Sequence, residues 1–206
     1  MSTVSPASVI SPERLAAAYS YASYRQLVDA ALAQGHTTGP QQSEALTAYT
    51  ALNVQRMSRL DKTVKLLPEL SAAAASLTGS YIGLIITEGW CGDASHTVPL
   101  MQAVAQASGG HLETRYFLRD THPDFIDRYL TNGGRAIPIA VVLHRDSLTE
   151  AAVWGPRPAP LQGLMKDLKA RETPFKEIIT QVNAWYAQDA TRTTQHELLA
   201  MVQKLR

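Results

Sequence analysis

Cysteine is almost absent from this chain of 206 residues, which contains a single one, Cys91. One thiol cannot close a disulfide bond within its own chain, so the sequence excludes a small secreted domain held together by disulfides. The six histidines are scattered and do not stand at ligand spacing around the cysteine. Structural zinc needs closely spaced cysteine and histidine ligands, so we predict no metal site.

Long hydrophobic runs are also missing. The longest apolar stretches, residues 81–86 and 136–143, are far shorter than the ~20 residues of a membrane-spanning helix. The N-terminal residues carry no basic patch, and the apolar stretch that follows them is broken by serines and ends at Arg25. That is not the pattern of a secretory signal. We therefore expect a soluble, cytoplasmic protein that does not bind membranes.

Neither sign of charge is in surplus. The 19 basic and 18 acidic residues nearly cancel and give a net charge of +1. Nucleic-acid-binding domains usually carry a basic surplus, so this balance argues against a nucleic-acid partner. Hydrophobic residues make up 45% of the chain and charged residues 18%, which is an ordinary globular composition. The length favours one compact core with attached helices.

The N-terminal part of the chain is predicted to be helical. Ser11-Pro12 is a typical helix start, with a capping serine and a first-turn proline. The spacing of apolar side chains predicts helices over residues 11–34, 41–67 and 71–76. We interpret residues 1–78 as an N-terminal helical extension packed on the core. The alternative is that its helices form the interface of a possible homodimer.

The pattern changes at Gly79. Residues 81–86 form a continuous apolar run, which is typical of a strand buried on both faces. The elements expected after it are a helix over 93–107, a strand over 112–118, a short helix over 123–130, strands over 136–143 and 148–154, and helices from 159 onward with breaks near 173–174 and 189–194. The first two strands should be parallel and the last two a hairpin. Residues 79–206 should therefore form one compact unit around a four-stranded mixed sheet, with helices on both faces.

Two motifs lie at the turns of this predicted sheet. Trp90-Cys91-Gly92-Asp93-Ala94 follows the buried strand and opens a helix, and Ile137-Pro138 begins the third strand. Together with the flanking residues 129–136 and 154–158, these motifs resemble a bacterial branch of the thioredoxin family, whose signature is W-C-x-x-C facing a cis-proline. The resemblance covers about residues 79–160. It implies an α/β thioredoxin-like three-layer sandwich with added N-terminal and C-terminal helices.

The chain departs from that signature at one position, because Ala94 stands where the family has its second cysteine. By resemblance, Cys91 is the attacking cysteine without its resolving partner. A mixed disulfide on Cys91 would then need an external thiol such as glutathione, and its substrate would be a protein disulfide or a glutathione mixed disulfide. The alternative is a redox-inactive thioredoxin-fold module that keeps the fold and its peptide groove for protein binding. Neither alternative requires a resident cofactor.

The acidity of Cys91 is open at this stage. A cysteine at a helix start faces unsatisfied N–H groups and the positive end of the helix dipole, and both favour the thiolate. The neighbouring carboxylate of Asp93 acts in the opposite direction. The sequence does not rank these two effects, but the Trp-Cys-Gly turn leads us to expect an accessible sulfur.

The resemblance also implies roles for the residues around the sulfur. Gly92, Asp93 and Ala94 would line the turn, and Trp90 would be a flat apolar wall beside the sulfur. Pro138 would form a cis bond opposite Cys91, leaving the backbone of Ile137 free to pair with an extended substrate.

Charged residues near the predicted site have alternative interpretations. His96 is either a solvated helix residue or a proton shuttle for Cys91. Arg119 and Asp120 are predicted to form an ion pair that anchors their loop. Arg135 either binds an anionic partner or forms a surface salt bridge. Residues 154–158 are interpreted as a structural turn.

Overall fold

The computed structural model describes residues 10–205, and its centre is a four-stranded mixed sheet with the strand order β2-β1-β3-β4. The strands are β1 (Tyr81–Thr87), β2 (Leu112–Leu118), β3 (Ile139–His144) and β4 (Glu150–Trp154). β1 pairs with β2 in parallel, whereas β3 pairs antiparallel with both β1 and β4. The predicted mixed sheet, with its parallel first pair and its final hairpin, is confirmed.

The apolar run in β1 explains its central position. All seven residues of this strand are buried, as expected for a strand with a neighbour on each side and helices on both faces. The chain then turns at residues 88–91 and enters a helix. The core therefore fixes the carboxyl end of β1, and with it the position of the turn at residues 88–91.

Helices surround the sheet. They are α1 (Pro12–Ala17), α2 (Tyr21–Ala33), α3 (Glu44–Thr63), α4 (Pro68–Ala75), α5 (Gly92–Ala107), α6 (Pro123–Ile126), α7 (Ala159–Ala170), α8 (Phe175–Asp189) and α9 (Arg192–Gln203). The predicted continuous helix over 11–34 is wrong, because the backbone of Tyr19 leaves the helix to pair with Tyr116 at the edge of β2, through N···O distances of 3.0 and 2.8 Å. Ser20 then caps α2.

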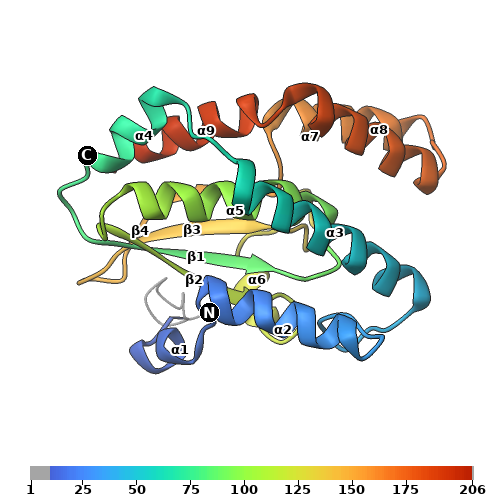
Figure 1. Ribbon diagram of the computed structural model, residues 1–206, viewed down its shortest axis with the longest axis horizontal. Coiled ribbons are helices and arrows are strands. Elements are labelled where there is room, and N and C mark those ends of the chain that lie inside the picture. The colour runs from blue at the N-terminus through green and yellow to red at the C-terminus, as the bar shows by residue number, and fades with distance from the viewer. Residues whose placement is uncertain (1–9, 206) are drawn as a thin grey trace, which may run out of the picture.

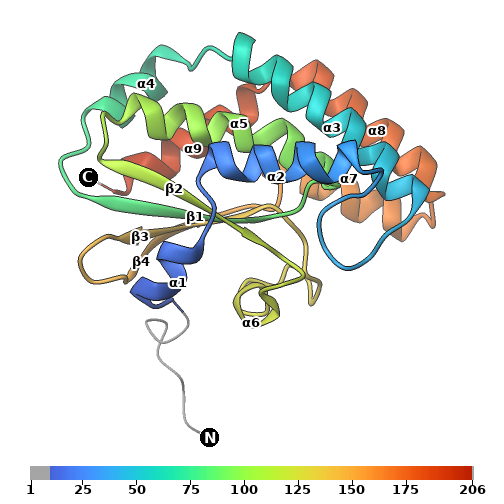
Figure 2. The same cartoon turned by 60° about the horizontal axis from the view of Figure 1, so that its bottom comes forward.

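The two faces of the sheet are covered by different numbers of helices. α5 lies on one face of the sheet, and the short helices α1 and α6 lie on the other (Figures 1 and 2). Outside α5, the helix α3 crosses it, and α4 packs on both α5 and α9. Helices α3 and α4, which precede β1, and helix α9, which follows β4, thus cover the α5 side together. This packing brings the two terminal parts of the chain next to each other.

The helices α7 and α8 form a separate apolar cluster. Its buried members are Leu161, Leu168, Ile178, Val182 and Tyr186. α8 also faces the start of α5, so this hairpin of helices forms one wall beside the turn that follows β1. None of the helices between residues 10 and 205 combines the length and apolarity that crossing a bilayer requires.

Candidate functional site

Cys91 is the N-cap residue of α5, where the chain passes from β1 into that helix. Its sulfur faces the Ile137–Pro138 peptide bond, which is cis. The Cys91 Sγ donates a hydrogen bond to the Ile137 carbonyl oxygen over 3.2 Å. The structure therefore brings together two motifs that are 46 residues apart, and the expected cis bond is confirmed.

The expectation of an accessible sulfur is wrong, because Cys91 is only 7% exposed. Burial raises the pKa of the Cys91 thiol to about 12, and the charge of Asp93 adds to this effect. Hydrogen bonds from the backbone of Ala94 and Asp93 and the charge of Arg157 lower the thiol pKa, but they are weaker. The competition between the helix start and the neighbouring acid is thus decided by burial, which favours the neutral thiol.

Asp93 is held in place from two other elements. Its Oδ2 accepts hydrogen bonds from the Arg157 Nε and Nη2 at 3.1 and 2.6 Å, and its Oδ1 accepts one from the Tyr186 hydroxyl at 2.8 Å. The side chains of Asp93 and Arg157 are only 12% and 15% exposed. The charge that opposes thiolate formation is therefore fixed beside the sulfur.

The contacts of Arg157 and Tyr186 with Asp93 were not predicted from the sequence. Residues 154–158 do form a turn between β4 and α7, but Arg157 in that turn also reaches the site. The position of Arg157 near the site could have been predicted from the topology of the sheet. β4 runs parallel to β1, since both are antiparallel to β3, so the segments that follow β1 and β4 meet at one edge of the sheet. Tyr186 had no such signal, because its position depends on how α8 packs.

Trp90 and Arg119 form the next part of the site. The Arg119 guanidinium carbon lies 4.6 Å from the centre of the Trp90 ring, a cation–π contact. The Arg119 Nε also donates to the Asp120 Oδ1 over 2.7 Å, which confirms the predicted ion pair. The expected wall beside the sulfur is thus an aromatic ring with a cation on it.

A buried acid fixes the loop before Cys91. The Glu88 carboxylate is fully buried and accepts hydrogen bonds from the Thr38 hydroxyl and, over 3.0 Å, from the Asp120 N–H. Burial raises the pKa of the Glu88 carboxyl. The Asn53 Nδ2 donates to the carbonyl oxygen of the neighbouring Gly89 over 3.0 Å. The turn is therefore held from α3 and from the loop before it, which the sequence analysis did not anticipate.

A cavity of about 360 Å³ opens above the sulfur, and we call it the Cys91 cavity. Of the residues that the resemblance assigns to the site, Trp90, Cys91, Gly92, Asp93 and Ile137 line it. Ala94 is buried in the core at 1% exposure, and Pro138 is buried and does not line the cavity.

The walls of the Cys91 cavity combine apolar side chains with arginines. The apolar side chains come from α3 and α8 and are Leu46, Tyr49, Leu52, Phe175, Ile179 and Val182. Phe175 is 65% exposed and Leu52 is 48% exposed, so both present apolar surface at the rim. The arginines are Arg56, Arg119, Arg135 and Arg157, and Asp93 is the one acid in the lining among the described residues. Such a cavity suits a ligand that has an apolar part and an acidic group.

Two charged residues take positions between the alternatives considered above. Arg135 forms the surface salt bridge, with its Nε 2.6 Å from the Asp127 Oδ1, and it also lines the Cys91 cavity. His96 is neither solvated nor next to the sulfur. Its ring stacks on Tyr186 with centroids 4.1 Å apart, and burial lowers its pKa to about 4. His96 therefore does not act as a proton shuttle for Cys91 in this arrangement.

The part of the chain between residues 10 and 205 contains no cluster of three or more histidine, cysteine, aspartate or glutamate side chains that could hold a metal ion. The site as described consists of one buried thiol, one fixed ion pair and an arginine-lined cavity. Its chemistry is therefore that of hydrogen bonding, charge pairing and apolar contact, with thiol exchange limited by the burial of the sulfur.

Comparisons with known proteins agree with the fold. The profile of a family described as Thioredoxin matches residues 39–169. A crystal structure of a Pseudomonas aeruginosa protein of unknown function is similar, with a TM-score of 0.62 and 15% identity over 96% of this chain and 99% of that one. An HIV epitope-scaffold gives a TM-score of 0.54 and 15% identity over 90% of this chain and 98% of that one. A comparison with curated proteins found no match.

Proposed function

The chain belongs to the thioredoxin family, and from that membership we propose that it is a binding module which holds an acidic, partly apolar segment of a partner protein in the Cys91 cavity. The observation that carries the proposal is the state of the sulfur. Cys91 is buried, its S–H is donated to the Ile137 carbonyl, and its thiol pKa is raised to about 12. The thiolate is the nucleophilic form. Because the thiol is held neutral, the site supports binding of a partner better than thiol–disulfide exchange.

The composition of the cavity supports an acidic segment. Arg119 and Arg135 lie on one side of the cavity, and both can offer guanidinium donors to a carboxylate while keeping one contact to their own acids. The apolar residues of α3 and α8 line the same cavity. The Ile137 N–H makes no hydrogen bond to another described residue, so it can pair with an extended backbone.

The test uses anilinonaphthalene sulfonate, whose aromatic body and sulfonate match the proposed chemistry. We expect saturable binding to the native protein, about tenfold weaker in Phe175→Ser because an exposed aromatic contact is lost. Leu130→Ser is the matched control, since Leu130 is also exposed, at 45%, but lies outside the cavity. Cys91→Ser should bind as the wild type does. Equal binding by Phe175→Ser and the wild type would remove the proposal.

A second candidate is monothiol exchange, and one observation favours it. The sulfur lines a cavity that is open to a ligand and lies beside the cis Ile137–Pro138 bond. In that reaction the Cys91 thiolate attacks one sulfur of a disulfide, a mixed disulfide forms, and the other sulfur leaves as a thiolate. An external thiol such as glutathione then attacks the mixed disulfide and releases Cys91.

The alkylation rate of Cys91 by iodoacetamide as a function of pH separates the two candidates. The binding module predicts slow alkylation whose rate rises only well above the free-thiol value of ~8.5, and no Cys91-dependent reduction of glutathione mixed disulfides. A thiol that titrates near or below ~7 would replace the binding module with the exchange reaction. Asp93→Asn should lower the thiol pKa, because a like charge is removed, and Asp146→Asn at the β3–β4 turn should leave it unchanged.

A further inference from the structure

A second cavity lies on the opposite side of Arg56 from the sulfur. It has a volume of about 710 Å³ and lies between the end of α3, the start of α5, α8 and the start of α9. Four cationic residues line it, namely Arg56, Arg59, Lys65 and Arg192. We call it the basic cavity. Within the part of the chain that the structure describes, its lining includes no aspartate or glutamate.

The four cations are not neutralised by the protein itself. None of them forms an ion pair with another residue in the range 10–205, whereas seven other arginines do: Arg14, Arg25, Arg115, Arg119, Arg135, Arg145 and Arg157. Arg56 and Arg59 are three residues apart on one helix, so they share a face. Burial and the charge of Arg59 lower the pKa of Arg56. Arg56 and Arg59 therefore repel each other.

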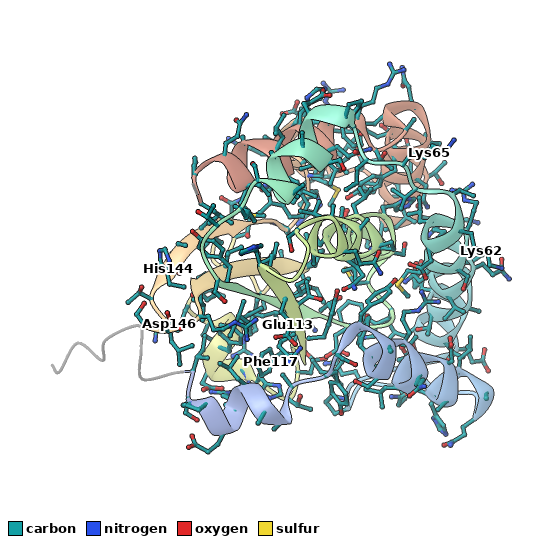
Figure 3. The ribbon with its side chains drawn as sticks, turned by 60° about the vertical axis from the view of Figure 1, so that its left-hand side comes forward. Lys62, Lys65, Glu113, Phe117, His144 and Asp146 are labelled. Carbon is teal, nitrogen blue, oxygen red and sulfur yellow. The ribbon has the colours of Figure 1, made fainter. Side chains whose placement is uncertain are left out.

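Their positions come from separate elements. Arg56 and Arg59 lie on α3, Lys65 follows that helix, and Arg192 is the first residue of α9. Figure 3 shows Lys62 and Lys65 at the end of α3, on the opposite side of the view from His144 and Asp146. The carboxylate of Asp189, three residues before Arg192, accepts hydrogen bonds from Thr193 at the start of α9 and forms no ion pair with Arg192 in the part of the chain that the structure describes.

His96 adds an independent observation. Its Nε2 is buried and has no hydrogen-bond partner among the described residues, although the ring lines the basic cavity and stacks on Tyr186. A buried polar atom without a partner is costly, and the side chain of Asn183, which also lines the basic cavity, interacts with the same ring. The apolar side chains of Leu60, Val64 and Leu67 complete the lining and suit an organic body.

From these contacts we infer that the basic cavity is a binding site for a small phosphorylated molecule with at least two negative charges. Guanidinium groups bind phosphate oxygens in pairs, and four unpaired cations match more than one negative charge. A cavity bounded by α3, α5, α8 and α9 suits a small molecule rather than a nucleic-acid strand, and the net charge of +1 provides no extended basic surface.

The site is distinct from the one proposed to bind a partner segment. The two cavities share Arg56 and Asn183 in their walls, but Cys91, Asp93 and the apolar rim belong to the Cys91 cavity alone. The inference therefore does not depend on the proposed binding module. Cys91→Ser and Phe175→Ser should bind a phosphate ligand as the wild type does.

Titration calorimetry of the full chain with inorganic pyrophosphate tests the site. We expect saturable binding at one site, weakened about tenfold in Arg59→Gln and in Arg192→Gln, because each removes a charged donor. Arg171→Gln is the matched control, since Arg171 is an exposed arginine at the end of α7 outside the cavity. Thermal unfolding of each variant shows whether it is folded.

Three results would overturn the inference. The first is no saturable binding of pyrophosphate at millimolar concentrations. The second is equal weakening in Arg59→Gln and Arg171→Gln, which indicates attraction by general charge. The third is tighter binding of citrate or of duplex DNA than of pyrophosphate, which would reassign the cavity to carboxylates or to nucleic acid.

Discussion

The two cavities are built from the same kind of side chain but use it differently. In the Cys91 cavity, Arg119, Arg135 and Arg157 each form an ion pair with an acid of the protein. In the basic cavity, no such acid is present in the lining that the structure describes. An arginine that is paired with an acid of the protein fixes the local geometry. An arginine without such a partner can bind an anionic ligand, and it repels neighbouring cations.

The ion pairs of the Cys91 cavity differ in how deeply they are buried. The pair between Asp93 and Arg157 is largely buried, whereas Asp127 and Arg135 are 45% and 47% exposed. A buried pair is strongly destabilised when one partner is lost, because the other is left as an uncompensated charge. An exposed pair contributes little, since water replaces the lost partner. The first pair should therefore be structural, and the second should be free to respond to a ligand.

The largest expected effect follows from that division. Asp93→Asn should lower the free energy of unfolding by about 3 kcal/mol, because Arg157 loses its partner in a buried position. Asp127→Asn, the matched exposed variant, should leave stability unchanged within the error of a urea titration. Similar values for the two variants would mean that Asp93 and Arg157 are no more buried in solution than the surface pair.

Much of this fold could be predicted from the sequence, because its signals are local. The apolar run of β1 predicts a central buried strand, and the motifs around Cys91 and Pro138 mark the two turns that meet at one sheet edge. The family resemblance added the cis bond, which no local pattern shows. The break between α1 and α2 was missed, since a single backbone pair with Tyr116 ends the helical run there.

The site was predicted less completely, because its decisive features arise from packing. The cavity that Cys91 lines is walled by α3 and α8, which lie in parts of the chain far from the motif. Tyr186 reaches Asp93 across 93 residues, and no spacing rule connects them. The basic cavity was also hidden in the sequence, since the balanced total charge of +1 gives no sign that folding brings Arg192 next to the cations of residues 56–65.

An effect of up to the same size concerns His96 and pH. The unfolded chain binds a proton on this residue near pH ~6.5, but the folded protein binds one only near the lowered pKa of about 4. The unfolded state therefore holds more protons between these values, and stability is complete above pH ~6.5 and falls as the pH drops toward ~4. At about 1.4 kcal/mol for each pH unit, the loss amounts to about 3 kcal/mol at most.

His96→Gln should remove that part of the acid sensitivity, and urea titrations across the range measure it. His196→Gln is the control, because His196 lies exposed on α9. The difference between the wild type and each variant isolates the histidine from the carboxyl groups that titrate in the same range. A wild-type pH profile in His96→Gln would show that the ring is solvated, and the basic cavity would then lose its unpartnered nitrogen.

The smallest expected effect is a change in the pKa of His96 when pyrophosphate binds in the basic cavity. Bound pyrophosphate should raise the pKa of His96 by about one unit, because a negative charge close to the ring favours its protonated form. By linkage, pyrophosphate should then bind more tightly as the pH falls through that pKa. Nuclear magnetic resonance of the histidine ring protons measures the pKa, with His96→Gln identifying the signal. A His96 pKa that stays unchanged at saturating pyrophosphate would place the anion elsewhere, and the unpaired arginines of α3 would then need a different explanation.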